Sequence, residues 1–225
     1  RLGGASKWWL NHAIQRLISD YKALGYDFQL IHNDTIKVVQ ELVHNNKNKD
    51  VSFHVSYDPD PKHRSLVKKI RDLGFVLKVY STNQIFEAGT VLNQQGKVYQ
   101  VFTPFYKALK QRKEEWLDGC DELTSDYNFS NHRLSNAVAL EQLELLPSIR
   151  WDTGITDYWQ PPRSAKWYWQ RFLDHVQNYG SSRDIPGEFG TSHLSPYLAW
   201  GELSPRQLYA SLHRRGLIDQ SEQWV

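Results

Sequence analysis

The stretch from Val51 to Tyr80, VSFHVSYDPDPKHRSLVKKIRDLGFVLKVY, decides the fold class. Residues 51–55 alternate between apolar and polar side chains, which is typical of a β-strand. Pro61 opens a helical pattern that Gly74 closes, and residues 75–80 form a second strand pattern. A strand, a helix and a strand in this order predict two parallel strands joined by a crossover helix.

The residues upstream continue the same alternation. The spacing of apolar residues predicts an amphipathic helix over 5–24, with Gly25 at its C-terminal cap. Residues 28–31 indicate a short strand, and Asn33 or Asp34 is suited to cap a further helix. We therefore predict an α/β domain over 1–115 with a parallel, doubly wound (Rossmann-like) sheet whose first strand or two precede Arg1.

The pattern changes after residue 115. Residues 116–162 are rich in polar residues, glycine and proline, and are predicted to form an interdomain connector. Helical patterns without strands follow, so 163–225 is predicted to be the start of an all-α domain, truncated here. One helix face there is predicted to be buried and consists of Trp167, Trp169, Phe172, Leu173 and Val176.

The composition excludes several classes of protein. With 40% hydrophobic and 23% charged residues and a net charge of +2, the chain has the composition of a soluble globular protein, and we expect a monomer. Its apolar runs are shorter than a membrane span, and it opens without a secretory leader. A single cysteine, Cys120, allows no internal disulfide, so a reducing, cytoplasmic location is expected. No metal-ligand spacing and no glycine-rich phosphate loop of the dinucleotide type is present.

The most informative segment for function is 179–207, YGSSRDIPGEFGTSHLSPYLAWGELSPRQ. Residues 190–196 place three hydroxyl groups and free backbone N–H groups before a predicted helix. A helix start can bind a phosphate group, because its N–H groups are unpaired and its dipole is positive there. The same residues are also typical of a simple helix N-cap, and the pattern alone leaves both readings open.

This segment resembles the stretch that opens the FAD-binding domain of DNA photolyases and cryptochromes. The matching features are a Tyr, an Arg-Asp pair, a Pro, Gly-Thr-Ser, Leu-Ser-Pro and Leu-Ser-Pro-Arg-Gln, in that order. The resemblance implies that six residues bind FAD: Tyr179, Thr191, Ser192, His193, Leu194 and Ser195. His193 stands where the family usually has Arg or Lys, so a charged neighbour of the phosphates is missing or depends on pH here.

The resemblance also implies a contact with damaged DNA. Arg183 matches a family arginine at the rim of the DNA-binding face, where it would contact a backbone phosphate. The alternative is an ordinary ion pair at the surface or at a domain interface.

The first half of the chain is similar to the same family. RLGGASKWWL at 1–10, and the combination of FEAG at 86–89 with VYQVFTPF at 98–105, match its α/β domain. In the family this domain binds a light-harvesting antenna chromophore. The Asn-Glu pair that contacts folate in some members falls at Asp60-Pro61, which argues against folate and leaves a deazaflavin, a flavin or an empty site. Taken alone, 98–102 indicates a short strand, Pro104 a helix start, and the many tryptophans core packing.

The resemblance implies a blue-light flavoprotein. The preferred function is a DNA photolyase, which repairs UV-induced pyrimidine dimers by light-driven electron transfer from reduced FAD. The alternatives are a cryptochrome that signals without repair, and an α/β module that never acquires FAD. No catalytic residue of the family falls within these residues, so the chain by itself is expected to be inactive and to hold FAD weakly or not at all.

Overall fold

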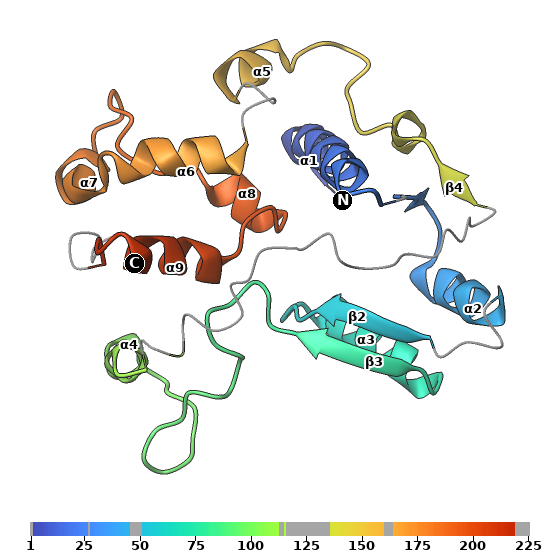
Figure 1. Cartoon of the computed structure of the whole chain (residues 1–225), viewed down its shortest axis with the longest axis horizontal. Helices are drawn as coiled ribbons and strands as arrows, with labels where there is room; N and C mark the ends of the chain where they lie inside the picture. The colour runs from blue at the N-terminus through green and yellow to red at the C-terminus, as the bar shows by residue number, and fades with distance from the viewer. Residues whose placement is uncertain are drawn as a thin grey trace. The chain divides into compact units, whose positions relative to one another are not determined.

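A computed structural model describes residues 2–26, 28–45, 51–112, 115, 136–159 and 164–218. Cys120 and the parts 116–135 and 160–162 of the predicted connector lie outside these residues. The described residues form two compact units (Figure 1). The first unit comprises the described residues up to Val79 together with 136–159, and the second comprises 80–115 together with 164–218.

The first unit contains the strand–helix–strand pattern that the sequence predicts. Strands β2 (Ser52–Ser56) and β3 (Val76–Tyr80) pair with each other and are joined by helix α3 (Pro61–Asp72). Figure 1 shows their arrows pointing the same way, as a crossover connection requires. Asp60 caps α3, because its side chain accepts a hydrogen bond from the backbone N–H of Lys62 at 2.6 Å. The mixed α/β class with a small parallel sheet is therefore correct.

Further helices and short strands complete this unit. Helix α1 (Gly4–Ala23) ends before Gly25, whose φ of +84° suits a C-terminal cap. Asp34 accepts hydrogen bonds from two N–H groups at the start of helix α2 (Thr35–Asn45). The remaining elements are strands β1 (Leu30–Ile31) and β4 (Ala137–Val138), the 3₁₀ turn η2 (Leu140–Leu143) and helix α5 (Thr153–Trp159).

The predicted strand over 28–31 does not join the parallel pair. It is shortened to β1, which pairs antiparallel with β4, with Leu30 opposite Val138 and Ile31 opposite Ala137. The partner comes from the segment that the sequence predicts to be connector. An apolar pair of residues with polar neighbours can form only a short ladder, and Val138 supplies the apolar partner.

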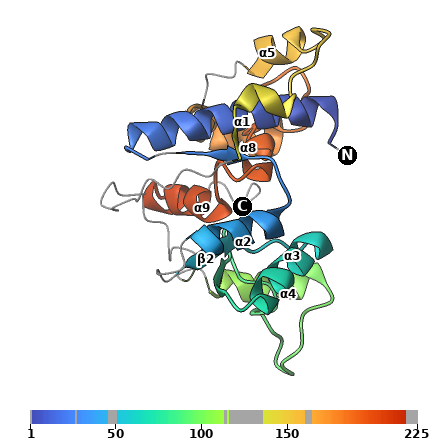
Figure 2. The ribbon, with the colours of Figure 1, turned by 90° about the vertical axis from the view of Figure 1, so that its right-hand side faces the viewer.

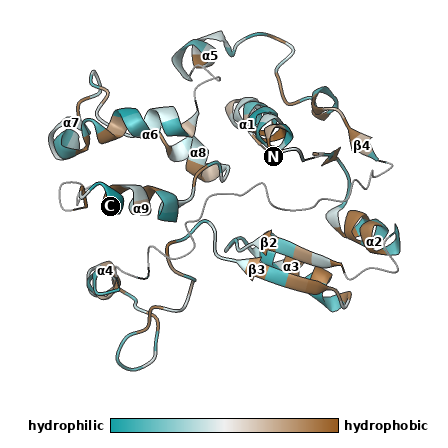
Figure 3. Ribbon diagram, in the orientation of Figure 1, coloured by the Kyte–Doolittle hydropathy of each residue, from teal (hydrophilic) through white to brown (hydrophobic). Residues whose placement is uncertain are grey.

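The second unit is helical. It contains α4 (Phe102–Lys110), α6 (Ala165–Leu173), the 3₁₀ turn η3 (Val176–Asn178), α7 (Tyr179–Ser182), α8 (Ser195–Ala199) and α9 (Pro205–Arg214). Figure 3 shows brown and teal residues on both α6 and α9, as expected for helices with one buried face. The buried side chains include Trp169, Phe172, Leu173, Val176, Leu208 and Leu212.

Two local predictions for this unit were wrong. Residues 98–102 do not form a strand: Val98 makes only an isolated bridge to Leu92, and Phe102 already begins α4. The cause is a tight turn at Gly96, where Asn93 Oδ1 accepts hydrogen bonds from the following backbone N–H groups.

The buried face of α6 differs from the predicted one in a single residue, Trp167. Trp167 is 36% exposed, and the guanidinium of Arg171 lies 5.5 Å from its ring centroid. Its neighbour Tyr168 is buried instead, at 2% exposure.

Candidate flavin site

The residues predicted to bind FAD lie on α7, on α8 and on the turn between them. Tyr179 begins α7, a helix of four residues that directly follows η3. Thr191, Ser192 and His193 form the turn, and Leu194 stands at the N-cap of α8. All of these belong to the second unit.

A close backbone contact joins the turn to α7. A Cβ atom built on Gly190 would lie 2.3 Å from the carbonyl oxygen and 2.9 Å from the Oγ of Ser182. Only glycine permits so close an approach, because any side chain would overlap the α7 backbone. The contact therefore holds the hydroxyl-bearing turn beside the short helix that carries Tyr179.

The hydroxyl groups of the turn are available to a ligand. Within the described part of the chain, no hydrogen bond involves the side chains of Thr191, Ser192 or Ser195. By contrast, Ser181 and Ser182 both donate to the backbone oxygen of Asn178, at 3.0 and 2.9 Å. The two groups of hydroxyls thus differ in role: one is used internally and the other is not.

Helix α8 is too short to provide a strong dipole. It has five residues, and Pro196 removes one N–H group from its first turn. The side chain of Leu194 is 1% exposed and belongs to the core, so only its backbone can face a ligand. The phosphate affinity of this turn must therefore depend on its hydroxyls and individual N–H groups more than on a helix dipole.

His193 lies in a stack of aromatic and cationic side chains. Its ring is 4.0 Å from that of Phe189 at an interplanar angle of 12°, and the guanidinium of Arg171 lies 3.8 Å from the centroid of Phe189. Burial, and after it the positive charge of Arg171, lowers the pKa of His193 below its ordinary value. At neutral pH the imidazole is therefore uncharged, and Arg171 is the nearby cation.

The backbone of His193 is also unusual. Its φ of +54° lies in the left-handed region, which few residues other than glycine adopt. The stack over Phe189 fixes the ring at this position. Neither Arg171 nor Phe189 was predicted to matter, because they lie 22 and 4 residues from His193 and show no shared periodicity with it.

Arg183 lies at the surface with a local partner. Its Nε is 3.5 Å from a carboxylate oxygen of Asp184, and its guanidinium lies 5.6 Å from the centroid of the Tyr179 ring. Both side chains of the ion pair are well exposed, so the pair contributes little to stability. Arg183 is thus accessible and is held next to the tyrosine of the candidate site.

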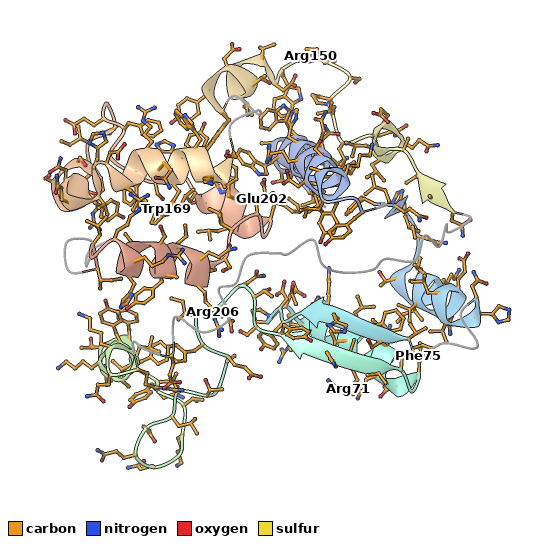
Figure 4. All side chains as sticks on the ribbon, viewed as in Figure 1. Arg71, Phe75, Arg150, Trp169, Glu202 and Arg206 are labelled. Carbon is orange, nitrogen blue, oxygen red and sulfur yellow. The ribbon has the colours of Figure 1, made fainter. Side chains whose placement is uncertain are left out.

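A separate hollow of about 550 Å³ is present in the same unit. Its wall includes Phe86, Val91, Tyr99 and Phe105. Arg206, labelled in Figure 4, donates from Nε to the backbone oxygen of Gln84 at 3.3 Å. Gln84 also lines the hollow, so this hydrogen bond fixes one edge of its wall. None of the six predicted FAD-binding residues lines it.

The described residues offer neither a metal site nor a membrane span. They contain no group of three or more His, Cys, Asp or Glu side chains able to hold a metal ion. None of the described helices combines the length and the hydropathy required for a membrane span.

Comparison with known proteins supplies the family. The family model described as DNA photolyase matches residues 1–123. A deoxyribodipyrimidine photo-lyase of Agrobacterium fabrum is 30% identical over 216 residues, which is 92% of this chain and 44% of that protein. Cryptochrome-2 of Arabidopsis thaliana is 24% identical over 232 residues, which is 96% of this chain and 36% of that protein.

A solved structure agrees with both comparisons. The crystal structure of a bacterial class III photolyase from Agrobacterium tumefaciens superposes with a TM-score of 0.79 at 26% identity, and the match covers 99% of this chain and 47% of that one. The chain thus spans less than half the length of these relatives. On the match of its first 123 residues and on these relatives, the chain belongs to the DNA photolyase and cryptochrome family.

Proposed function

We propose that this chain is part of a DNA photolyase, a flavoprotein that repairs UV-induced pyrimidine dimers in blue light. The observation that carries the proposal is the contact between Gly190 and Ser182, which holds the start of the 191–195 turn against α7, the helix that begins at Tyr179. These are the positions that the family resemblance assigns to FAD. When bound, reduced FAD supplies the electron that splits the dimer on illumination.

Each residue of the turn has a role in the proposal. The hydroxyls of Thr191, Ser192 and Ser195 would donate to the diphosphate, and the side chain of Tyr179 would lie against the cofactor. His193 and Leu194 would contribute through their backbone N–H groups, since the His193 ring is stacked on Phe189 and the Leu194 side chain is buried. The residues present therefore fit a bound diphosphate.

Arg183 is proposed to contact a phosphate of damaged DNA. Its accessibility supports this role, because the weak ion pair with Asp184 can be exchanged for a phosphate at small cost. In a longer protein containing this chain, Arg183→Ala is expected to weaken DNA binding and to reduce its salt dependence.

A second candidate function is a cryptochrome-type photoreceptor that binds FAD and signals without repair. The similarity to Cryptochrome-2 over 96% of this chain favours this candidate. Illumination of a longer, FAD-loaded protein with dimer-containing DNA separates the two functions. Loss of dimers supports the photolyase, and their persistence supports the photoreceptor.

The flavin site is tested by its retention of FAD. Thr191→Ala combined with Ser192→Ala should lower the flavin content of the longer protein, and Ser181→Ala, whose hydroxyl is used internally, should leave it unchanged. For the 225-residue chain alone we propose weak FAD binding or none. Unchanged flavin content in the double variant would refute the assigned roles.

Several finer assignments belong to the same proposal. The β2–α3–β3 unit would be part of a larger, doubly wound parallel sheet in a domain over 1–115, joined by a connector over 116–162 to a helical domain that begins at 163. The protein would be cytoplasmic and monomeric. Folate is disfavoured as its antenna chromophore in this proposal, because Asp60-Pro61 stands where the folate-contacting Asn-Glu pair falls in some members of the family.

A further inference from the structure

A second hollow lies in the first unit, between helix α1 and the segment 140–148. It measures about 770 Å³, within the range of small-molecule sites. Figure 2 shows the yellow turn η2 lying against α1, and the two elements are in contact. The helix contributes Asn11, His12 and Gln15, and the opposite segment contributes Glu141 and Glu144, among others.

Asn11 is the residue that points to a ligand. Its side chain lines the hollow although the residue is only 8% exposed. Among the residues that the structure describes, no hydrogen bond to its amide is found. The amide atoms are not themselves sealed from water, so the amide is open to the hollow and can gain a hydrogen-bonding partner there. A ligand in the hollow would supply that partner.

The neighbours of Asn11 define what such a ligand presents. A side-chain amide offers one donor and one acceptor in a single plane, which matches the edge of a nucleobase. Gln15 lies one helical turn further along α1 and adds a second amide to the same hollow. The ring of His12 is fixed edge-on against Trp8 at a centroid distance of 4.5 Å, so it adds a rigid aromatic surface.

The charges of the hollow select against phosphate. Glu141 and Glu144 are exposed on the segment opposite α1, and both accept hydrogen bonds only. Burial, and after it the charge of Arg16, lowers the pKa of His12, so this ring does not neutralise them at pH 7. Leu140, Leu145 and Leu146 complete an apolar wall.

We propose that this hollow binds an uncharged nucleobase-type heterocycle, such as a base or nucleoside, and discriminates against the corresponding nucleotide. The base edge would pair with the Asn11 amide, and the two carboxylates would accept from sugar hydroxyls while repelling phosphate. This site is separate from the proposed flavin site, since every residue that lines it belongs to the first unit.

The test uses the 225-residue chain with adenosine, guanosine and AMP as probes in calorimetry and in amide chemical-shift mapping. At least one nucleoside should bind with a Kd below about 1 mM, shifting signals of residues 10–16 and 140–148, and AMP should bind at least tenfold more weakly. Asn11→Leu should weaken nucleoside binding at least tenfold, whereas Ser19→Ala, on the same helix but outside the hollow, should not. Glu141→Gln combined with Glu144→Gln should raise the affinity for AMP until it is close to the affinity for the nucleoside.

Three outcomes would overturn the proposal. They are binding of neither nucleoside, binding that shifts other residues, and equal binding of adenosine and AMP to the unchanged chain. Because the shift mapping uses the unchanged chain, the proposal remains testable even if Asn11→Leu does not fold. Failure here leaves the flavin proposal intact, which rests on residues of the other unit.

Discussion

Gly190 approaches Ser182 so closely that a Cβ atom on it would lie 2.3 Å from the Ser182 carbonyl oxygen. The contact fixes where the 191–195 turn begins relative to α7. It also explains why a glycine is needed at this point of the chain: the constraint is steric and comes from a backbone atom that cannot rotate away.

Gly190→Ala is therefore expected to disturb the candidate flavin site. The added methyl group must displace α7 or the turn, which should lower the free energy of unfolding by about 1–3 kcal/mol. In a longer, flavin-binding protein it should also lower FAD content. Gly187→Ala is the matched control, since a Cβ there meets no atom within 4 Å. Equal stability and flavin content for the two variants would contradict the role assigned to the contact.

The link between α6 and α9 gives a second prediction. Trp169, labelled in Figure 4 and 5% exposed, donates from Nε1 to Ser211 Oγ at 3.0 Å. Ser211→Ala removes this partner of a buried donor and should cost about 1–3 kcal/mol in urea unfolding. In a Trp169→Phe background the same change should cost much less, because the donor is already absent. Equal costs in both backgrounds would show that the hydrogen bond does not couple the helices.

The local elements of this fold could be predicted because their signals lie close together in the sequence. Pro61 and Gly74 bound α3, and the alternation of residues 51–55 appears as β2. The pairing of β1 with β4 could not be predicted, because it joins residues more than 100 positions apart and involves only two residues on each strand. Such a short, non-local ladder leaves no periodic pattern.

The candidate site divides in the same way. The hydroxyls at 191, 192 and 195 were found by resemblance to a motif, and motifs are contiguous. The stack of Arg171, Phe189 and His193 was missed, since it depends on the packing of α6 against the turn. The unpartnered amide of Asn11 was missed as well, because burial of a single polar residue within an amphipathic helix is decided by what packs on that helix.

The start of α9 offers a test of local stability. Ser204 accepts a hydrogen bond from the N–H of Gln207, and the Gln207 side chain accepts one from the N–H of Ser204, so the two form a capping box. Ser204→Ala should lower the free energy of unfolding by about 1 kcal/mol, and Ser204→Gly by only a few tenths. Urea denaturation of the three proteins measures both values. An alanine variant as stable as the glycine variant would contradict the capping role.

His193 makes a prediction about pH. Its pKa in the folded chain is lowered, first by burial and then by the charge of Arg171, whereas in the unfolded chain it is close to the ordinary value of about 6.5. Below that value the unfolded chain takes up a proton that the folded chain does not, so stability should fall as the pH drops from about 7 toward 5. Above about pH 7.5, one unit over the ordinary pKa, the ring is neutral in both states and contributes almost no slope. The pKa of His12 is lowered by burial and by Arg16, so this residue also makes stability fall as the pH drops.

His193→Gln and His12→Gln should each flatten the dependence of Tm on pH over this window, and the double variant should flatten it further. A profile for His193→Gln that parallels the unchanged chain would show that the stack does not hold the imidazole neutral.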